Sequence, residues 1–112
     1  MNQFKLEGTL TKDPYFKDGG SWTMAKVTIL PAGQEKGAIE VTLWGELAAA
    51  VKDAKKGATV AVQGSLRNRK RDDLTHAKAD YANKPVWVTD LNADSKENGT
   101  VTVDGVEAGL PF

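Results

Sequence analysis

The chain has no cysteine among its 112 residues. Disulfides, thiolate metal sites and thiol nucleophiles are therefore excluded, and the composition agrees with a reducing compartment. Histidine is almost as scarce, because His76 is the only one and stands in a polar, irregular stretch. The paired carboxylates Asp72 and Asp73 stand beside cations, and no Walker or dinucleotide-binding motif is present. We therefore expect neither an enzyme nor a bound metal or cofactor.

Long apolar runs are missing too. The N-terminal MNQFKLEGTL has no charged segment followed by an apolar run, so export and membrane insertion are not expected, whereas a cytoplasmic location is. A composition of 40% hydrophobic and 27% charged residues is that of an ordinary globular chain. Its length suits a single domain with a modest core.

A net charge of one sign is also lacking, since 15 cations balance 15 acids. The distribution is uneven, however. Residues 92–112 hold four acids against Lys96, a net charge of −3, which leaves +3 on residues 1–91. This asymmetry permits a nucleic-acid ligand. We predict a domain over residues 1–91 and a short acidic tail over residues 92–112. The alternative for part of that tail is a hairpin, with Thr100–Val103 as a strand and Asp104-Gly105 as the turn.

What the sequence does contain is period-two alternation. Residues 4–11, 22–30 and 39–44 alternate apolar and polar side chains, as half-buried strands do. Pro31-Ala32-Gly33 ends the second of these segments and predicts a hairpin to the third. The predicted inward-facing residues are Phe4, Leu6, Gly8, Leu10, Ala25, Val27, Ile29, Ile39, Val41 and Leu43.

The second half of the chain predicts one helix and two strands. Residues 46–56 carry apolar side chains at helical spacing, with Gly57 where a C-terminal cap belongs. Strands follow over residues 59–71 and 85–91. Three strands, a helix and two strands is the order of an OB-fold. We predict an all-β, five-stranded Greek-key barrel with one α-helix between strands 3 and 4. The helix would close one end of the barrel with Leu47, Val51 and Ala54.

Aromatic and basic residues on the outward faces point to a ligand. Trp44 falls on the face opposite Val41 and Leu43, and three arginines share one face of the strand over residues 59–71. Single-stranded nucleic acid is bound by such a combination, because rings stack on bases and cations track phosphates. The structural alternatives are a core or interface role for Trp44 and a solvated strand end that protects the sheet edge. The arginines are Arg67, Arg69 and Arg71.

The two other tryptophans are less clearly assigned. Trp22 shares the outward face of its strand with Lys26, and base stacking and interface packing are equally compatible with it. Trp87 has an ambiguous register and is interpreted as a core residue. Lys17 stands in a short segment between two turns and is a further predicted nucleic-acid contact.

Five segments resemble, in order and spacing, the bacterial and phage single-stranded DNA-binding protein family. They are GTLTKDP (8–14), MAKVTIL (24–30), VTLWGEL (41–47), KKG (55–57) and VQGSLRNRK (62–70). The resemblance implies that Trp44 stacks on a base and that Arg67, Arg69 and Lys70 follow the DNA backbone. It also implies a homo-oligomer, tetramer or dimer. The last residues, Leu110, Pro111 and Phe112, look like the family's tip that docks on replication and repair proteins.

The chain also departs from the family pattern. Arg71 stands where another stacking aromatic is common, and the loop over residues 31–37 is short. We therefore expect a compact, weaker binder of phage or otherwise divergent origin, acting in the cytoplasm of the bacterium or host. Its predicted function is to bind and protect single-stranded DNA during replication, recombination or repair, with little sequence preference. Two alternatives stay open: a protein–protein adaptor such as a primosome accessory, and a reader of RNA or oligosaccharide.

Overall fold

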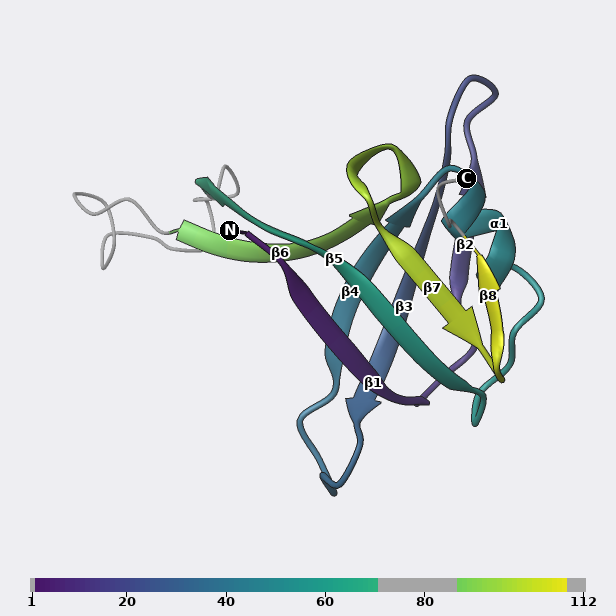
Figure 1. The fold of residues 1–112 in the computed structure, drawn as a ribbon, viewed down its shortest axis with the longest axis vertical. Coiled ribbons are helices and arrows are strands. Elements are labelled where there is room, and N and C mark those ends of the chain that lie inside the picture. Colours follow the sequence, from purple (N-terminus) through teal and green to yellow (C-terminus); the bar gives the residue numbers. More distant parts are fainter. Residues whose placement is uncertain (1, 71–86, 109–112) are drawn as a thin grey trace, which may run out of the picture.

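The computed structural model describes residues 2–70 and 87–108, which form a curled sheet and one short α-helix (Figure 1). No helix in these two ranges is long and apolar enough to cross a membrane. The elements are β1 (Phe4–Leu10), β2 (Tyr15–Asp18), β3 (Thr23–Pro31), β4 (Ile39–Trp44), α1 (Glu46–Val51), β5 (Thr59–Lys70), β6 (Trp87–Asp94), the 3₁₀ turn η3 (Ser95–Glu97), β7 (Thr100–Val103) and β8 (Val106–Ala108).

Five of the strands close into a barrel in the order β1-β3-β4-β6-β5, because β5 pairs back onto β1. The β4–β6 pairing is parallel and the other four are antiparallel. This is the predicted all-β OB barrel with its helix between the third and fourth barrel strands, and the prediction is confirmed. Two additions lie outside the barrel path: β2 pairs with β3, and the β7–β8 hairpin lies along β5.

The core lies inside the barrel and consists of the inward half of each alternating strand. Ala25, Val27 and Ile29 of β3 are at most 1% exposed, as the period-two pattern predicts. β-branched side chains fit this pleated interior, and fully burying one stabilises the fold by about 1.5–3 kcal/mol. Leu47 and Val51 of α1 are fully buried and cover one end of the barrel.

The helix is shorter than predicted. It ends at Val51 instead of Lys56, and Ala48 is buried while Ala50 is exposed. The cause is competition for backbone hydrogen bonds in the following segment. Lys56 donates its N–H to the Asp13 side chain at 2.7 Å, and Gly57 donates to the Leu10 carbonyl at 2.9 Å. These contacts with Leu10, at the end of β1, and with Asp13, three residues beyond it, replace helical ones, so the predicted cap at Gly57 is wrong.

The far half of β5 extends beyond the barrel together with β6 (Figure 1). Leu66 therefore stays 39% exposed, although it falls in register with the inward-facing Val60 and Val62. The Asn2 side chain extends the β1–β5 pairing here. It accepts the Leu66 N–H at 2.9 Å and donates to the Leu66 carbonyl at 2.7 Å.

The predicted acidic tail is wrong over residues 92–108, where the alternative hairpin is found. β6 continues to Asp94, past the predicted boundary at Leu91, and β7 pairs with β5 so that Val101 is fully buried. Asp104 and Gly105 form the turn to β8 with positive φ. The apolar alternation of Val101 and Val103 decides the outcome, because it matches Val62 and Val60 across the sheet. The predicted docking residues Leu110, Pro111 and Phe112 lie outside the described residues.

Candidate nucleic-acid interface

The register of three strands gathers the predicted site residues on the outer face of the barrel. Met24 pairs with Lys17 on one side and with Trp44 on the other, and Lys26 pairs with Tyr15 and with Thr42. Because residues 25, 27, 41 and 43 point into the core, their neighbours in the sequence point out. The β2–β3–β4 surface therefore carries two rings and two ammonium groups side by side.

This surface is hollowed by a groove of about 470 Å³. Tyr15 and Trp22 stand at it as exposed rings, 55% and 43% accessible. Three lysines supply positive charge, against one carboxylate. The lining residues are Lys12, Tyr15, Lys17, Trp22, Met24, Lys26, Thr28 and Glu40.

The Trp22 indole is held by the turn that precedes β3. Gly19 donates its N–H to the Trp22 carbonyl at 2.8 Å, and Gly20 donates to the Asp18 side chain at 2.9 Å. The ring lies directly against Gly19, where a Cβ atom would come within 2.1 Å of Cε2. The Lys17 ammonium stands 5.9 Å from the ring centroid, within cation–π range. The structure thus brings together two residues that the sequence predicted separately.

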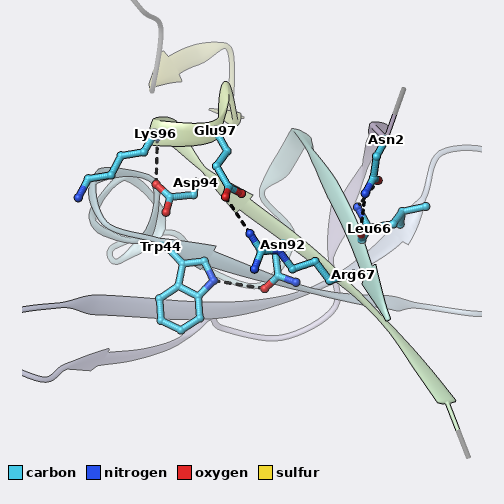
Figure 2. A network of polar contacts seen from close by, with 8 residues as sticks. All are labelled: Asn2, Trp44, Leu66, Arg67, Asn92, Asp94, Lys96 and Glu97. Atoms are coloured by element: carbon cyan, nitrogen blue, oxygen red, sulfur yellow. Dashed lines mark hydrogen bonds and ion pairs between the residues drawn. The ribbon is translucent and has the colours of Figure 1, made fainter. Parts of the chain in front are cut away.

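Trp44 is half-buried and fixed from a neighbouring strand. Its Nε1–H donates to Oδ1 of Asn92 on β6 at 3.2 Å (Figure 2). The indole lines a hollow of about 160 Å³ that it shares with Trp22 and Lys96, and a second hollow of about 210 Å³ that it shares with Arg67 and Asn92.

The three hollows are linked by shared lining residues. Trp22 lines both the 470 Å³ groove and the 160 Å³ hollow, and Trp44 lines both the 160 Å³ hollow and the 210 Å³ hollow. We call the combined surface the aromatic groove. It begins at Lys12 and Tyr15, passes Trp22 and Trp44, and ends at Arg67. Positively charged side chains interleaved with rings along one path suit a flexible polyanion that carries flat bases.

Arg67 is paired rather than free. Its Nη2 lies 2.8 Å from Oε1 of Glu97. The Arg67 side chain is 61% accessible to solvent and the Glu97 side chain 50%. The carboxylate comes from η3, within the region that the sequence placed in a tail (Figure 2). This end of the groove is lined by Arg67 against the two carboxylates Asp94 and Glu97, so its cation is fully offset.

The remaining predicted cations lie farther along β5. Arg69 and Lys70 end that strand, where their backbones pair with Val88 and Trp87. Arg71 lies outside the described residues. Trp87 is described only as a strand position, and its side chain, for which a core role is predicted, is not described.

Sequence reasoning missed several groove residues, namely Lys12, Asn92, Lys96 and Glu97. The outward position of Tyr15 could have been predicted, because its alternation with Lys17 in β2 places both on one face. Asn92, Lys96 and Glu97 carried no such local signal. They reach the groove only because β6 pairs in parallel with β4.

A separate hollow of about 390 Å³ lies on the β1–β5–β7 surface. It contains Lys5 as its one cation, opposed by Glu7, and no aromatic ring among its lining residues. A base has nothing to stack on there. The aromatic groove is therefore the better candidate for a nucleic-acid interface.

Comparison with known proteins agrees with this fold. The model of the Single-strand binding protein family matches residues 1–86. A solved structure described as Plasmodium falciparum SSB complex with ssDNA superposes with a TM-score of 0.63 at 16% identity, covering 92% of this chain and 94% of that one. The single-stranded DNA binding protein from Thermus aquaticus gives a TM-score of 0.61 at 24% identity, over 83% of this chain and 38% of that one. No curated protein sequence matches significantly.

Proposed function

The chain belongs to the Single-strand binding protein family, and from that premise we propose that it binds single-stranded DNA with little sequence preference through the aromatic groove. The observation that carries the proposal is the path of three rings, Tyr15, Trp22 and Trp44, flanked by lysines on one face of the barrel. The neighbour from Plasmodium is described as a complex with single-stranded DNA, which supports the same ligand class.

Stacking supplies the affinity that does not depend on sequence. Every base has a π-face, and each base stacked on an aromatic ring contributes about 1–3 kcal/mol. The indoles of Trp22 and Trp44 are already held, one against Gly19 and the other by Asn92. Less side-chain freedom is then lost on binding, so more of the stacking energy appears as affinity.

Phosphate contacts supply the rest. Lys12, Lys17 and Lys26 line the first hollow, and Lys96 lines the hollow between the two tryptophans. An ammonium that neutralises a phosphate releases a counterion, so affinity falls with salt at a log–log slope of about −0.7 per contact on a single strand. We propose Arg69, Lys70 and Arg71 as further phosphate contacts, since Arg69 and Lys70 follow Arg67 on β5 and Arg71 is the next residue in the sequence.

The biological role follows from the ligand. We propose that the protein covers single strands exposed during replication, recombination or repair in the cytoplasm, as a dimer or tetramer. Residues 110–112 would dock on enzymes of those processes. The resemblance of Leu110, Pro111 and Phe112 to the docking tip of the family supports this role.

The decisive experiment is a titration of intrinsic tryptophan fluorescence with a long oligo-dT at low and moderate salt, with duplex DNA as the control. Quenching by the single strand alone, weakening as salt rises, is the expected result. Trp44→Ala should reduce the quenching, with Trp22 accounting for the remainder, and weaken binding by an amount that varies little with salt. Unchanged fluorescence together with no salt-sensitive binding would refute the proposal.

A further inference from the structure

Arg67 has an anionic partner before any nucleic acid is bound, because Glu97 accepts a hydrogen bond from its guanidinium at 2.8 Å. A phosphate oxygen binds a guanidinium in the same way as a carboxylate oxygen does. Both ligands would need the same donors at the end of the aromatic groove. We infer that Glu97 is an internal competitor of phosphate for Arg67 and so limits single-strand affinity at this end. The inference rests on the proposed function.

The backbone of Glu97 belongs to a hydrogen-bonded turn. The Asp94 side chain accepts the Lys96 N–H at 3.0 Å, and Gly99 donates to the Asp94 carbonyl at 2.8 Å. Gly99 closes the turn so tightly that a Cβ atom there would meet the Asp94 backbone at 2.6 Å. The backbone that carries the carboxylate is therefore ordered, so that pairing with Arg67 costs only side-chain freedom.

The competition is partial because the pair is open to water. With side chains 61% and 50% accessible, the pair is screened and contributes little to stability, so a phosphate can displace Glu97. Displacement leaves a carboxylate beside the bound strand, in a hollow that already contains Asp94. Arg67 then neutralises no net phosphate charge. Its removal alone should change the salt slope little, in contrast to a lysine of the groove.

The test uses the full chain and compares Glu97→Gln with Asp53→Asn. Glutamine keeps the shape of the side chain and removes its charge. The control removes one carboxylate from the segment after α1, at an exposed position outside the groove lining. Affinity for oligo-dT is measured over a range of salt concentrations by fluorescence titration.

Glu97→Gln should bind about two- to five-fold more tightly than the control, the range that one exposed ion pair allows. Its log–log salt slope should be steeper by about 0.7, because Arg67 becomes a phosphate contact. Adding Arg67→Gln to Glu97→Gln should abolish both gains.

Equal affinity and slope for Glu97→Gln and Asp53→Asn would overturn the inference while leaving the proposed function intact. Weaker binding by Glu97→Gln would also overturn it, and would mean that the carboxylate holds Arg67 in a productive position. Absence of single-strand binding by the unchanged chain would instead refute the proposed function, and the inference with it.

Discussion

The side chain of Asn92 accepts the indole N–H of Trp44 at 3.2 Å and thereby ties β6 to the most enclosed ring of the groove. The two residues are 48 positions apart in the chain, and the parallel pairing of their strands brings them together. The hydrogen bond fixes the plane of an indole that would otherwise rotate about its side-chain torsions. Trp44 is therefore pre-organised for stacking by a side chain from another strand.

Replacing Asn92 with alanine should weaken single-strand binding without changing its salt slope. A typical intramolecular hydrogen bond contributes about 0.5–1.5 kcal/mol, so the expected loss in affinity is about two- to ten-fold. Asn68→Ala is the matched control, because Asn68 accepts a hydrogen bond from Thr89 on the same pair of strands, away from the groove lining. Equal affinities for the two variants would show that the Trp44 orientation does not depend on Asn92.

Gly19→Ala should displace the Trp22 ring with little effect on the fold. The new methyl group would lie 2.1 Å from Cε2 and 2.3 Å from Cζ2 of Trp22, so the indole must move. The ring is 43% exposed and can turn toward solvent, so the stability measured by urea unfolding should change by less than about 1 kcal/mol. Oligo-dT binding should weaken as much as it does in Trp22→Ala.

The double variant Gly19→Ala with Trp22→Ala provides the check on this prediction. Once Trp22 is alanine, Gly19→Ala has no ring to displace and should cost no further affinity. Additive losses from the two changes would mean that the alanine perturbs the β2–β3 turn instead of the indole.

Lys26→Gln should flatten the salt dependence of binding. Lys26 lies on the central strand of the β2–β3–β4 surface, paired in register with Tyr15 and Thr42, and lines the groove. Loss of one phosphate contact reduces the log–log slope by about 0.7. Lys55→Gln, in the exposed segment after α1, removes the same charge outside the groove lining and should leave the slope unchanged. A slope unaffected by Lys26→Gln would remove this lysine from the interface.

The sequence could predict those parts of the structure that local periodicity determines. Val41 and Leu43 alternate with Trp44 in a period-two pattern, which placed the strand, its buried face and its outward-facing ring correctly. The helix length could not be predicted in the same way. Its end depends on Asp13 and Leu10 taking the backbone donors of residues 56 and 57. Those acceptors come from a part of the chain more than 40 residues away.

The same limit applies to the groove. Trp22 was assigned to an outward face by alternation and Lys17 to a short segment between two turns, and they meet in the structure. The partner of Arg67 was not predictable, because Glu97 lies 30 residues away and reaches it only through the course of β6. Its charge was counted as part of a tail, and net charge by segment contains no information on which carboxylate meets which cation.

The hairpin that replaces the predicted tail should be required for stability. Val101 on β7 is fully buried against the core, whereas Val106 on β8 is 74% exposed. Val101→Ala removes the equivalent of two buried methylene groups and leaves a cavity, so the free energy of unfolding should fall by about 2 kcal/mol. Val106→Ala makes the same chemical change at an exposed site and should cost less than about 0.5 kcal/mol. Urea unfolding followed by tryptophan emission measures both. Equal, small losses would mean that residues 100–108 do not belong to the cooperative core, and that the domain ends at β6.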